Sequence, residues 1–304
     1  MWDASSFVSR LEKLDGVSFR RDARLSALTS FGVGGPADVL AVAGHAGGLA
    51  GLLELARDAD ARVFVMGAGT NVLFEDAGYR GVVLKLGGGF GGVAEDPAEK
   101  GRVTAGAAAQ WSDLTAFCVA HSLSGLQQTA GIPGTVGGAL AGNAGAFGAA
   151  VGDRVAEVTG YDREGRERKL RSRDVRFDYR RADFGCELVL TGTTLALAQG
   201  EREALGREVA DVLARRREKQ PLEFPSAGSV FKNPQGGKAG RLIDEAGLKG
   251  RRVGGAQVSE KHANFIVNTG GAKAGDVVAL IELVREEVWR RFSVRLELEV
   301  KVVT

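Results

Sequence analysis

The chain has 304 residues, which exceeds the usual size of a single hydrophobic core and leads us to expect two or three domains. Hydrophobic residues make up 44% and charged residues 26%, a composition that excludes intrinsic disorder, and a net charge of +2 argues against a dedicated nucleic-acid or membrane binder. Two cysteines are too few for a disulfide framework. Because no apolar run could cross a bilayer and the N-terminus contains no apolar signal core, we expect a cytoplasmic protein. We assign no metal site.

Hydrophobic periodicity predicts the secondary structure. Apolar residues at helical spacing predict helices over residues 49–56, 111–121, 201–219 and 275–292. Apolar or alternating runs predict strands over residues 63–66, 82–86, 155–161, 188–191, 265–268 and 296–303. Ser112 is the expected N-cap of the second helix, and Cys118 in the same helix reads as a small core residue. We place domain boundaries near residues 85 and 200, which gives domains 1–85, 86–200 and 201–304.

Basic residues crowd together between Arg163 and Arg181. A solvated hairpin surface would account for them, and so would a patch that steers anionic substrates.

Glycine is the compositional outlier, with 45 residues against 6 prolines. The glycines cluster at residues 67–69, 87–92, 131–148 and 236–240, between strand-like and helix-like runs. Glycine adopts positive φ angles and lets the main chain approach a ligand closely. The clusters therefore predict main chain wrapped around something large.

The first glycine segment, residues 63–71, runs from a strand into a glycine turn. The backbone amides of Gly67, Ala68, Gly69 and Thr70 could form a nest for a diphosphate, with the Thr70 hydroxyl and the Asn71 amide as further donors. On pattern alone such a turn is more often only a turn. The segment also lacks the Rossmann spacing, and no helix clearly follows it.

The second glycine segment, residues 131–148, is more specific. It reads Gly131-Ile-Pro-Gly-Thr-Val-Gly-Gly138 and then Asn143-Ala-Gly-Ala-Phe-Gly148. Pro133 restricts the backbone φ angle, whereas the glycines around it allow a wide range of angles. This combination predicts main chain shaped to lie along a flat or phosphorylated ligand.

Together with further motifs, the two glycine segments resemble the UDP-N-acetylenolpyruvoylglucosamine reductase family over nearly the whole chain after residue 25. The other motifs are Thr29-Ser-Phe-Gly-Val-Gly-Gly-Pro-Ala37, Tyr179-Arg180, Ala227-Gly-Ser229-Val-Phe-Lys-Asn233-Pro, Gly240-Arg-Leu-Ile-Asp-Glu-Ala-Gly-Leu-Lys-Gly250 and Ser259-Glu-Lys-His-Ala-Asn-Phe-Ile-Val-Asn268. The resemblance implies an α+β chain with an FAD-binding domain of the p-cresol methylhydroxylase type, built from two α/β subdomains, and a smaller C-terminal α+β substrate domain. In the family reaction NADPH reduces FAD, hydride passes to C3 of the enolpyruvyl ether of UDP-N-acetylglucosamine, and C2 is then protonated to give UDP-N-acetylmuramate for peptidoglycan.

The resemblance also implies site residues. Its catalytic set falls on Arg180, Ser229 and Glu299, and its nucleotide-sugar contacts fall on Lys219, Asn233 and Arg241. The residues that it implies for FAD are Gly67, Ala68, Gly69, Thr70, Asn71, Gly131, Ile132, Pro133, Gly134, Thr135, Gly138, Asn143 and Gly145. We expect the FAD to be non-covalent, because all three histidines and both cysteines lie outside the glycine segments, and we expect a monomer.

Each catalytic assignment has a plainer alternative on pattern alone. Arg180 could hold a structural carboxylate, Ser229 could be a turn hydroxyl, and Glu299 could lie on the solvated face of a half-buried final strand. Likewise, Arg241 could form a surface ion pair within its helix.

The chain departs from the family pattern at a few positions. Leu298 and Lys301 flank Glu299 where the family usually has proline and arginine, and Ala182 stands where it tends to have serine. No tyrosine follows Tyr179, so the chain resembles the shorter class, which has no tyrosine-bearing lid.

Three functions stay open at this point. The first is the reductase, the second is a related FAD-dependent oxidase that reacts with oxygen, and the third is a non-catalytic nucleotide-sugar-binding protein of the same fold. The motifs around Ser229 and Asn264 disfavour the oxidase, and the presence of all three catalytic candidates disfavours the binding protein.

Overall fold

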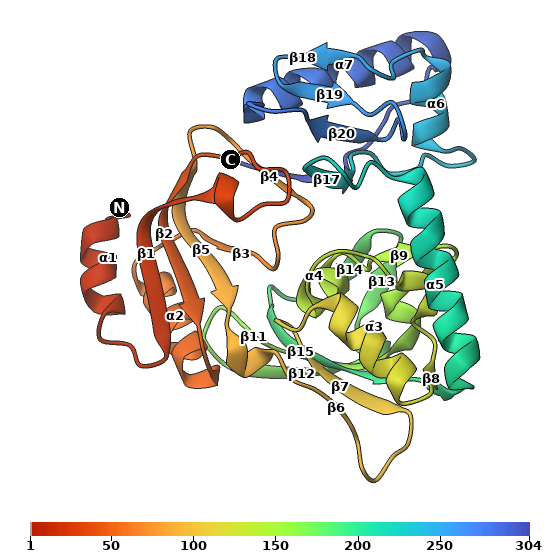
Figure 1. Ribbon diagram of the computed structural model, residues 1–304. Helices are drawn as coiled ribbons and strands as arrows, with labels where there is room; N and C mark the ends of the chain where they lie inside the picture. The colour runs from red at the N-terminus through yellow and green to blue at the C-terminus, as the bar shows by residue number, and fades with distance from the viewer. Residues whose placement is uncertain (1) are drawn as a thin grey trace. The chain divides into compact units, whose positions relative to one another are not determined.

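The computed structural model describes residues 2–304 and divides the chain into two compact units, drawn as ribbons in Figure 1. The first unit contains residues up to 21, 39–67 and 81–214, and the second contains residues 22–38, 68–80 and 215–304. The linear boundaries near residues 85 and 200 remain predictions. The α-helices of the described chain are α1 (Ala4–Leu11), α2 (Ala46–Asp58), α3 (Trp111–Ala120), α4 (Val136–Ala141), α5 (Arg202–Lys219), α6 (Ala239–Glu245) and α7 (Ala274–Phe292).

A four-stranded sheet packs against α1 and α2. Its order is β1 (Val17–Arg24), β2 (Pro36–Ala43), β5 (Tyr79–Leu86) and β3 (Val63–Val65). Phe7 of α1, Leu52 of α2 and Leu84 of β5 meet in one buried cluster. β3 and β5 run parallel, and the amide of Met66 continues their pairing by donating to the carbonyl oxygen of Leu84. The first glycine segment therefore leaves the sheet at the end of β3.

A five-stranded antiparallel sheet forms the rest of the first unit's core. Its order is β12 (Glu167–Arg171), β11 (Val155–Tyr161), β15 (Val189–Ala196), β7 (Arg102–Gly106) and β6 (Val93–Glu95). Trp111 and Leu114 of α3 and Leu140 of α4 are buried against it, and Cys118 is buried with them as expected.

The N-cap of α3 is Gln110, so the expectation of Ser112 as the cap is wrong. Ser112 lies inside the first turn, where its hydroxyl donates to the Asp113 carboxylate. The helix starts two residues earlier than a capping Ser112 would place it. The Trp111 ring is fully buried and its indole N–H donates to Thr129, and this packing fixes the first turn.

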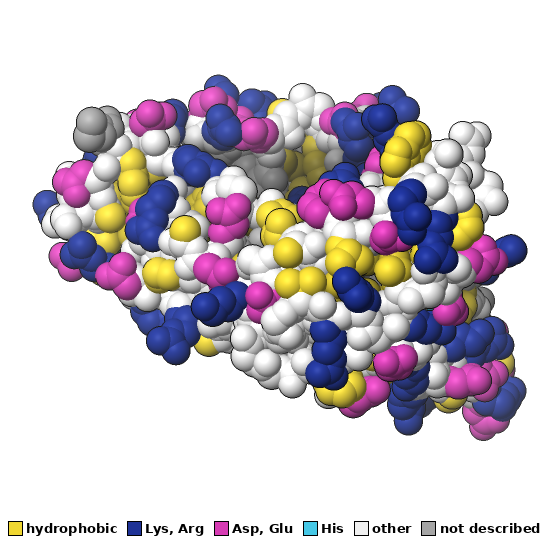
Figure 2. Space-filling view, turned by 90° about the horizontal axis from the view of Figure 1, so that it is seen from above, with side chains coloured by type: hydrophobic (Ala, Val, Ile, Leu, Met, Phe, Trp, Pro, Cys, Tyr) yellow, Lys and Arg dark blue, Asp and Glu magenta, His cyan; other side chains and the backbone are white. Residues whose placement is uncertain are grey.

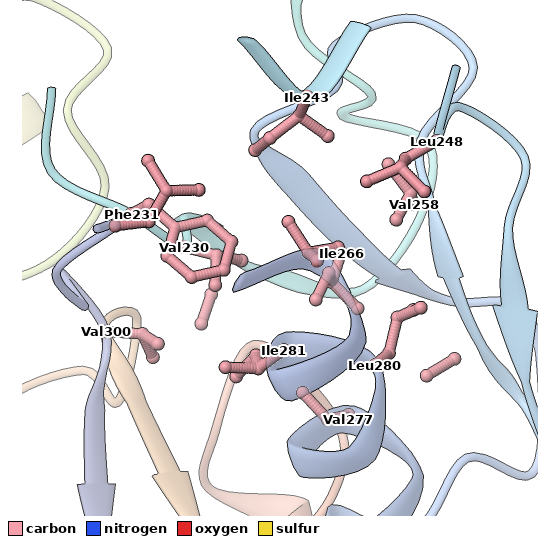
Figure 3. Close-up of a cluster of buried hydrophobic side chains, with 14 of the residues drawn as sticks. Val230, Phe231, Ile243, Leu248, Val258, Ile266, Val277, Leu280, Ile281 and Val300 are labelled. Carbon is pink, nitrogen blue, oxygen red and sulfur yellow. The ribbon is translucent and has the colours of Figure 1, made fainter. Parts of the chain in front are cut away.

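The second unit contains a four-stranded antiparallel sheet covered by α7. Its order is β17 (Ser226–Ser229), β20 (Phe265–Asn268), β19 (Ala256–Val258) and β18 (Arg252–Val253). In Figure 3, Val277, Leu280 and Ile281 project from α7 into the same buried cluster as Ile266 of the sheet. The apolar residues that were predicted at helical spacing thus form the face of α7 that packs into this core.

Four short pairs of strands complete the topology. They are β9 (Gly145–Ala146) with β10 (Ala149–Ala150), β13 (Arg176–Asp178) with β14 (Arg181–Asp183), β8 (Leu123–Ser124) with β16 (Ala198–Gln199), and β4 (Val72–Phe74) with β21 (Lys301–Val303). The last pair is parallel and joins the end of the first glycine segment to the C-terminal segment. No helix in residues 2–304 is long and apolar enough to span a bilayer.

The final strand is shorter than its alternating pattern predicts. Residues 296–303 do not form one strand, because the chain makes a single bridge at Leu298, bends at Glu299 and Val300, and resumes as β21 at Lys301. The amides of Glu299 and Val300 both donate to the carbonyl oxygen of Val230, at 2.8 and 3.3 Å. The bend therefore follows from a partner elsewhere in the unit, which a local alternation cannot reveal.

Candidate active site

Ser229 lies at the end of β17, immediately after a β-bulge. Ser226 pairs with Val267 and Ser229 with Phe265, so two residues of β17 stand opposite one of β20. Gly228 within the bulge has a φ of +74°, a conformation that residues with side chains rarely adopt. A bulge re-aims the side chain that follows it. The Ala-Gly-Ser order of the motif thus has a structural cause, since the glycine sets the direction of the serine.

Asn264 fixes the segment that follows Ser229. Its side-chain carbonyl accepts the amide of Phe231 at 3.0 Å, and its side-chain amide donates to the carbonyl of Phe231 at 2.8 Å. The amide of Val230 donates to the main-chain carbonyl of Asn264 at 2.9 Å. Asn264 is buried, and both the oxygen and the nitrogen of its side-chain amide are hydrogen-bonded. The side chain therefore pairs with the main chain of Phe231, close to Ser229, as a neighbouring strand would. We did not assign Asn264 from the sequence, and its only signal was membership of the Ser259–Asn268 motif.

His262 supports the same turn. Its imidazole Nδ1 accepts the amide of Asn264 at 3.2 Å, and its ring stands edge-on to Phe265. Burial lowers the pKa of His262, with a smaller contribution from the charge of Lys249. Because the acceptor role requires a neutral nitrogen, the lowered pKa keeps the turn intact at neutral pH.

Glu299 is held next to the Ser229 loop through its main chain. Its amide donates to Val230, the residue after Ser229, at 2.8 Å. Its carbonyl accepts the side-chain amide of Asn71 at 3.1 Å, and the amide of Lys301 donates to the carbonyl of Asn71. The second unit therefore brings together the main chains of two of the three catalytic candidates, Ser229 and Glu299, and ties Glu299 to Asn71 of the first glycine segment. Neighbouring Glu297 instead faces solvent and contacts Lys232 at 3.5 Å.

Arg180 lies in the first unit, in the two-residue turn between β13 and β14. Asp178 and Arg181 pair across the hairpin and flank the turn. Arg180 has a φ of +57°, which is uncommon for a residue with a long side chain. Its guanidinium carbon lies 5.3 Å from the ring centroid of Tyr179, and its Nε is buried. The positive φ makes Arg180 a candidate for a functional position.

The two glycine segments meet at Gly67 and Thr135 in the first unit. A Cβ added at Gly67 would overlap the Thr135 hydroxyl, which caps α4 by accepting the amide of Gly138 at 3.3 Å. In the second unit, a Cβ at Gly69 would overlap the carbonyl oxygen of Leu28, and Gly69 has a φ of +69°. Gly134 has a φ of +115°. Glycine is favoured at these positions, because a Cβ at Gly67 would meet the Thr135 side chain and the backbone has a positive φ at Gly69 and Gly134.

Asn143 contributes its side chain to the fold of the first unit. Its amide nitrogen donates to the carbonyl of Asp178 and its amide oxygen accepts the amide of Gly152, both at 2.9 Å. Asn143 thus resembles Asn71. Each lies in a glycine segment, and the side chain of each bonds main chain in a segment that carries a catalytic candidate. Their direct role toward a cofactor stays a prediction.

The three substrate candidates all belong to the second unit. Lys219 is the exposed last residue of α5. Asn233 accepts the amide of Ala239 at 3.0 Å, which caps the first turn of α6 from outside the helix. Arg241 contacts Glu245 at 2.7 Å, the surface pair that we gave as its alternative. Their roles toward a substrate remain predictions.

The basic stretch from Arg163 to Arg181 is neutralised by acidic neighbours. Arg166 and Arg168 both contact the buried carboxylate of Asp162, and Lys169 contacts Glu157 at 2.9 Å. Other pairs are Arg163 with Glu187, Arg176 with Asp178, and Arg181 with Asp183. These contacts favour the solvated hairpin surface over an anion-steering patch. On the face shown in Figure 2, too, basic and acidic side chains are interspersed.

Two family models match the chain. The FAD binding domain matches residues 37–171, and the model described as UDP-N-acetylenolpyruvoylglucosamine reductase, C-terminal domain, matches residues 220–303. The second match covers the Ser229 loop and the Glu299 bend. These matches confirm the expected fold, an FAD-binding domain of the p-cresol methylhydroxylase type followed by a smaller α+β domain.

Relatives extend the similarity to nearly the full length. The UDP-N-acetylenolpyruvoylglucosamine reductase of Heliobacterium modesticaldum is 45% identical and covers 92% of this chain and 88% of its own length. The UDP-N-acetylenolpyruvoylglucosamine reductase 2 of Symbiobacterium thermophilum is 44% identical and covers 98% of this chain and 97% of its own.

Solved structures agree with these relatives. The crystal structure of UDP-N-acetylenolpyruvylglucosamine reductase from Thermus caldophilus aligns with a TM-score of 0.79 at 34% identity, covering 95% of this chain and 99% of that one. Wild-type BBE-like 1 of Physcomitrella patens aligns with a TM-score of 0.50 at 17% identity over 64% of this chain and 44% of that one, a likeness of fold alone. The chain therefore belongs to the UDP-N-acetylenolpyruvoylglucosamine reductase family.

Proposed function

We propose that the chain reduces UDP-N-acetylglucosamine enolpyruvate to UDP-N-acetylmuramate for peptidoglycan synthesis, as an FAD-dependent oxidoreductase that uses NADPH. The observation that carries this function is the agreement with relatives of that name over 92% and 98% of the chain. The contact between the Ser229 loop and the Glu299 bend supports it, because it fixes a hydroxyl-bearing and a carboxyl-bearing residue on one scaffold.

The residues of the two glycine segments fit a bound FAD. Gly67 and Gly69 leave no room for a Cβ, and Gly131 and Gly134 have φ angles of +73° and +115°. Main chain in these conformations exposes amides to a diphosphate without side chains in the way. When bound, FAD supplies the two-electron carrier between NADPH and the substrate. We assign its binding to Gly67, Ala68, Gly69, Thr70, Asn71, Gly131, Ile132, Pro133, Gly134, Thr135, Gly138, Asn143 and Gly145.

Arg180 is assigned to the carboxylate of the enolpyruvyl group. Addition of hydride to C3 moves the electron pair of the double bond toward C2 and the carboxylate, so negative charge grows on the carboxylate oxygens. A guanidinium offers a planar pair of donors that matches two carboxylate oxygens and stabilises that charge. The backbone of Arg180, with its positive φ, fixes the direction in which the side chain leaves the turn.

Ser229 is assigned as the proton donor to C2. A hydroxyl is a weak acid, but an enolate carbon is a strong enough base to take its proton when the geometry holds the two together. The bulge at Gly228 and the Asn264 clamp hold the main chain of Ser229 in place. With hydride added at C3 and this proton added at C2, the double bond becomes a saturated ether.

Glu299 is assigned as a carboxyl that, when protonated, donates a hydrogen bond to the developing enediolate. An ionised carboxylate would repel that charge, whereas a shared proton turns the repulsion into a charge-assisted hydrogen bond. The main chain of Glu299 is held at both ends, by Val230 and by Asn71.

Lys219, Asn233 and Arg241 are assigned to the nucleotide sugar. The cations suit a diphosphate, and Arg241 would have to exchange its Glu245 partner for it. We further propose that the protein acts as a cytoplasmic monomer with domains 1–85, 86–200 and 201–304, and that its FAD is non-covalent. Flavin released into the supernatant by acid precipitation is expected, and flavin in the pellet would contradict non-covalent binding.

The proposed function is tested by mixing the purified yellow protein with NADPH and then with the enolpyruvyl substrate under anaerobic conditions. The flavin absorbance should bleach with NADPH and return with the substrate. Return on admission of air but not with the substrate would identify the oxidase. A colourless protein that binds the nucleotide sugar would identify the non-catalytic binding protein.

A further inference from the structure

Asn143 is a buried polar residue in the middle of the second glycine segment. It is 7% exposed, and its φ of +40° is one that asparagine tolerates better than most residues. Both halves of its side-chain amide are used, the nitrogen toward Asp178 and the oxygen toward Gly152, each at 2.9 Å. A side chain that is this buried and fully hydrogen-bonded is fixed in place, and it fixes its partners in turn.

The partner on the nitrogen side is the turn that carries Arg180. Asp178 is the last residue of β13, and its carbonyl directly precedes the two-residue turn. Arg180 occupies the left-handed region at +57°, and a conformation of that kind persists only where surrounding contacts enforce it. The ion pairs of this hairpin, Arg176 with Asp178 and Arg181 with Asp183, are between exposed side chains and constrain it weakly. The Asn143 side chain, in contrast, is buried and bonds the main chain directly before the turn.

We propose that Asn143 is a positioning residue for Arg180: its side-chain amide holds the carbonyl of Asp178 and so sets where the guanidinium meets the substrate carboxylate. This inference rests on the proposed function, since it assumes that Arg180 binds that carboxylate. It also gives Asn143 two separate duties, because its main chain belongs to the glycine segment while its side chain serves the catalytic turn.

The test is Asn143→Asp. Aspartate keeps the size of asparagine and can still accept the amide of Gly152, but it turns the donor toward Asp178 into an acceptor that faces another acceptor. We expect normal flavin content and bleaching by NADPH within about twofold of wild type. Reoxidation by the enolpyruvyl substrate should slow by roughly tenfold or more, the scale of losing one buried hydrogen bond at a reacting group.

Ligand binding separates positioning from general damage. UDP-N-acetylglucosamine lacks the enolpyruvyl carboxylate, so Asn143→Asp should leave its affinity unchanged while weakening binding of the enolpyruvyl substrate. Asp153→Asn is the matched control, because the Asp153 carboxylate accepts the amide of Ala150 at 2.8 Å, a bond within residues 150–153 rather than one to the turn. This control should leave both ligands and both half-reactions unchanged. If Asn143→Asp does not fold, Asn143→Gly, which suits the positive φ, is measured in the same way.

The outcomes are distinct. Equal weakening of both ligands, or loss of flavin, would overturn the inference and assign the side chain to the cofactor or to the fold. Arg180→Lys gives the reference, and Asn143→Asp should add little to it, because the two changes act on one contact. Full additivity would contradict positioning. If Arg180→Lys alone left reoxidation at the wild-type rate, the proposed role of Arg180 would fail, whatever the Asn143 variants did.

Discussion

The side-chain amide of Asn71 donates a hydrogen bond of 3.1 Å to the main-chain carbonyl of Glu299, across 228 residues of sequence. The bond joins the end of the first glycine segment to the bend before β21. β4 and β21 continue the connection as a parallel pair, from Val72 with Lys301 to Phe74 with Val303. The loop assigned to the cofactor and the segment that carries a catalytic candidate are therefore parts of one structural element.

Asn71→Ala should slow the half-reaction that uses Glu299. Loss of one hydrogen bond is worth ~1 kcal/mol, which corresponds to about a fivefold lower rate of flavin reoxidation by the enolpyruvyl substrate. Bleaching by NADPH should keep its wild-type rate, because we expect the Asn71 side chain to serve Glu299 and its main chain to serve the FAD. Stopped-flow absorbance at the flavin band resolves the two phases. Loss of flavin together with equal slowing of both phases would instead assign the Asn71 side chain to the cofactor.

Gly69→Val and Gly134→Val should each abolish FAD retention. Both glycines have positive φ angles, which a β-branched residue tolerates poorly, and a Cβ at Gly69 would also overlap the Leu28 carbonyl. Gly92→Val is the control, because nothing lies within 4 Å of a Cβ at Gly92. The ratio of flavin to protein absorbance measures retention. Wild-type stoichiometry in either variant of the glycine segments would remove that segment from the cofactor site.

Ser229→Ala should separate the half-reactions. It removes one hydroxyl and no charge, so NADPH should bleach the flavin at nearly the wild-type rate. Reoxidation by substrate should slow at least roughly a hundredfold, the lower worth of a positioned general acid. Ser226→Ala, in the same strand, should change neither phase. Equal slowing of both phases by Ser229→Ala would mean that the serine shapes the pocket, and its role as proton donor would be abandoned.

His262 should make stability fall at mildly acidic pH. Burial lowers its pKa below the ordinary value of about 6.5, so the unfolded chain binds the proton more readily than the folded chain. Neutral His262 therefore stabilises the fold fully above about pH 6.5, the ordinary pKa of histidine. This contribution is lost as the pH falls from there toward the lowered pKa of the folded state. The melting temperature should therefore drop from pH 7.5 to 5.5 in wild type and less in His262→Gln. Parallel curves for the two proteins would contradict this assignment.

The two cysteines should differ in reactivity. Burial, with a smaller contribution from Glu95, raises the pKa of Cys118 to about 12, so almost none of it is thiolate at pH 8. Cys186 is exposed. A chromogenic disulfide reagent should therefore modify one thiol in the native protein and two after unfolding in denaturant. Cys186→Ser should abolish the native reaction, and rapid native reaction of both thiols would contradict the buried position of Cys118.

The sequence predicted the elements whose cause is local. The apolar spacing of α7 and the cations in the last turn of α5 follow from helix geometry and the helix dipole, so the observed bounds lie within one residue of those expected. The sequence motifs likewise identified the family. Glycine at positions 69, 134 and 228 is a local signal too, because each of them adopts a positive φ.

The tertiary structure decided how the candidate residues are held. The pattern of residues 296–303 predicts one strand, but the carbonyl of Val230 accepts two successive amides and the chain bends at Glu299. In the same way, Asn71, Asn143 and Asn264 look like ordinary turn residues in the sequence. Each instead bonds main chain that lies 228, 35 or 33 residues away. Hydrogen bonds at such separations depend on the final packing and impose no period on the sequence, so only the folded chain reveals which asparagines support the site.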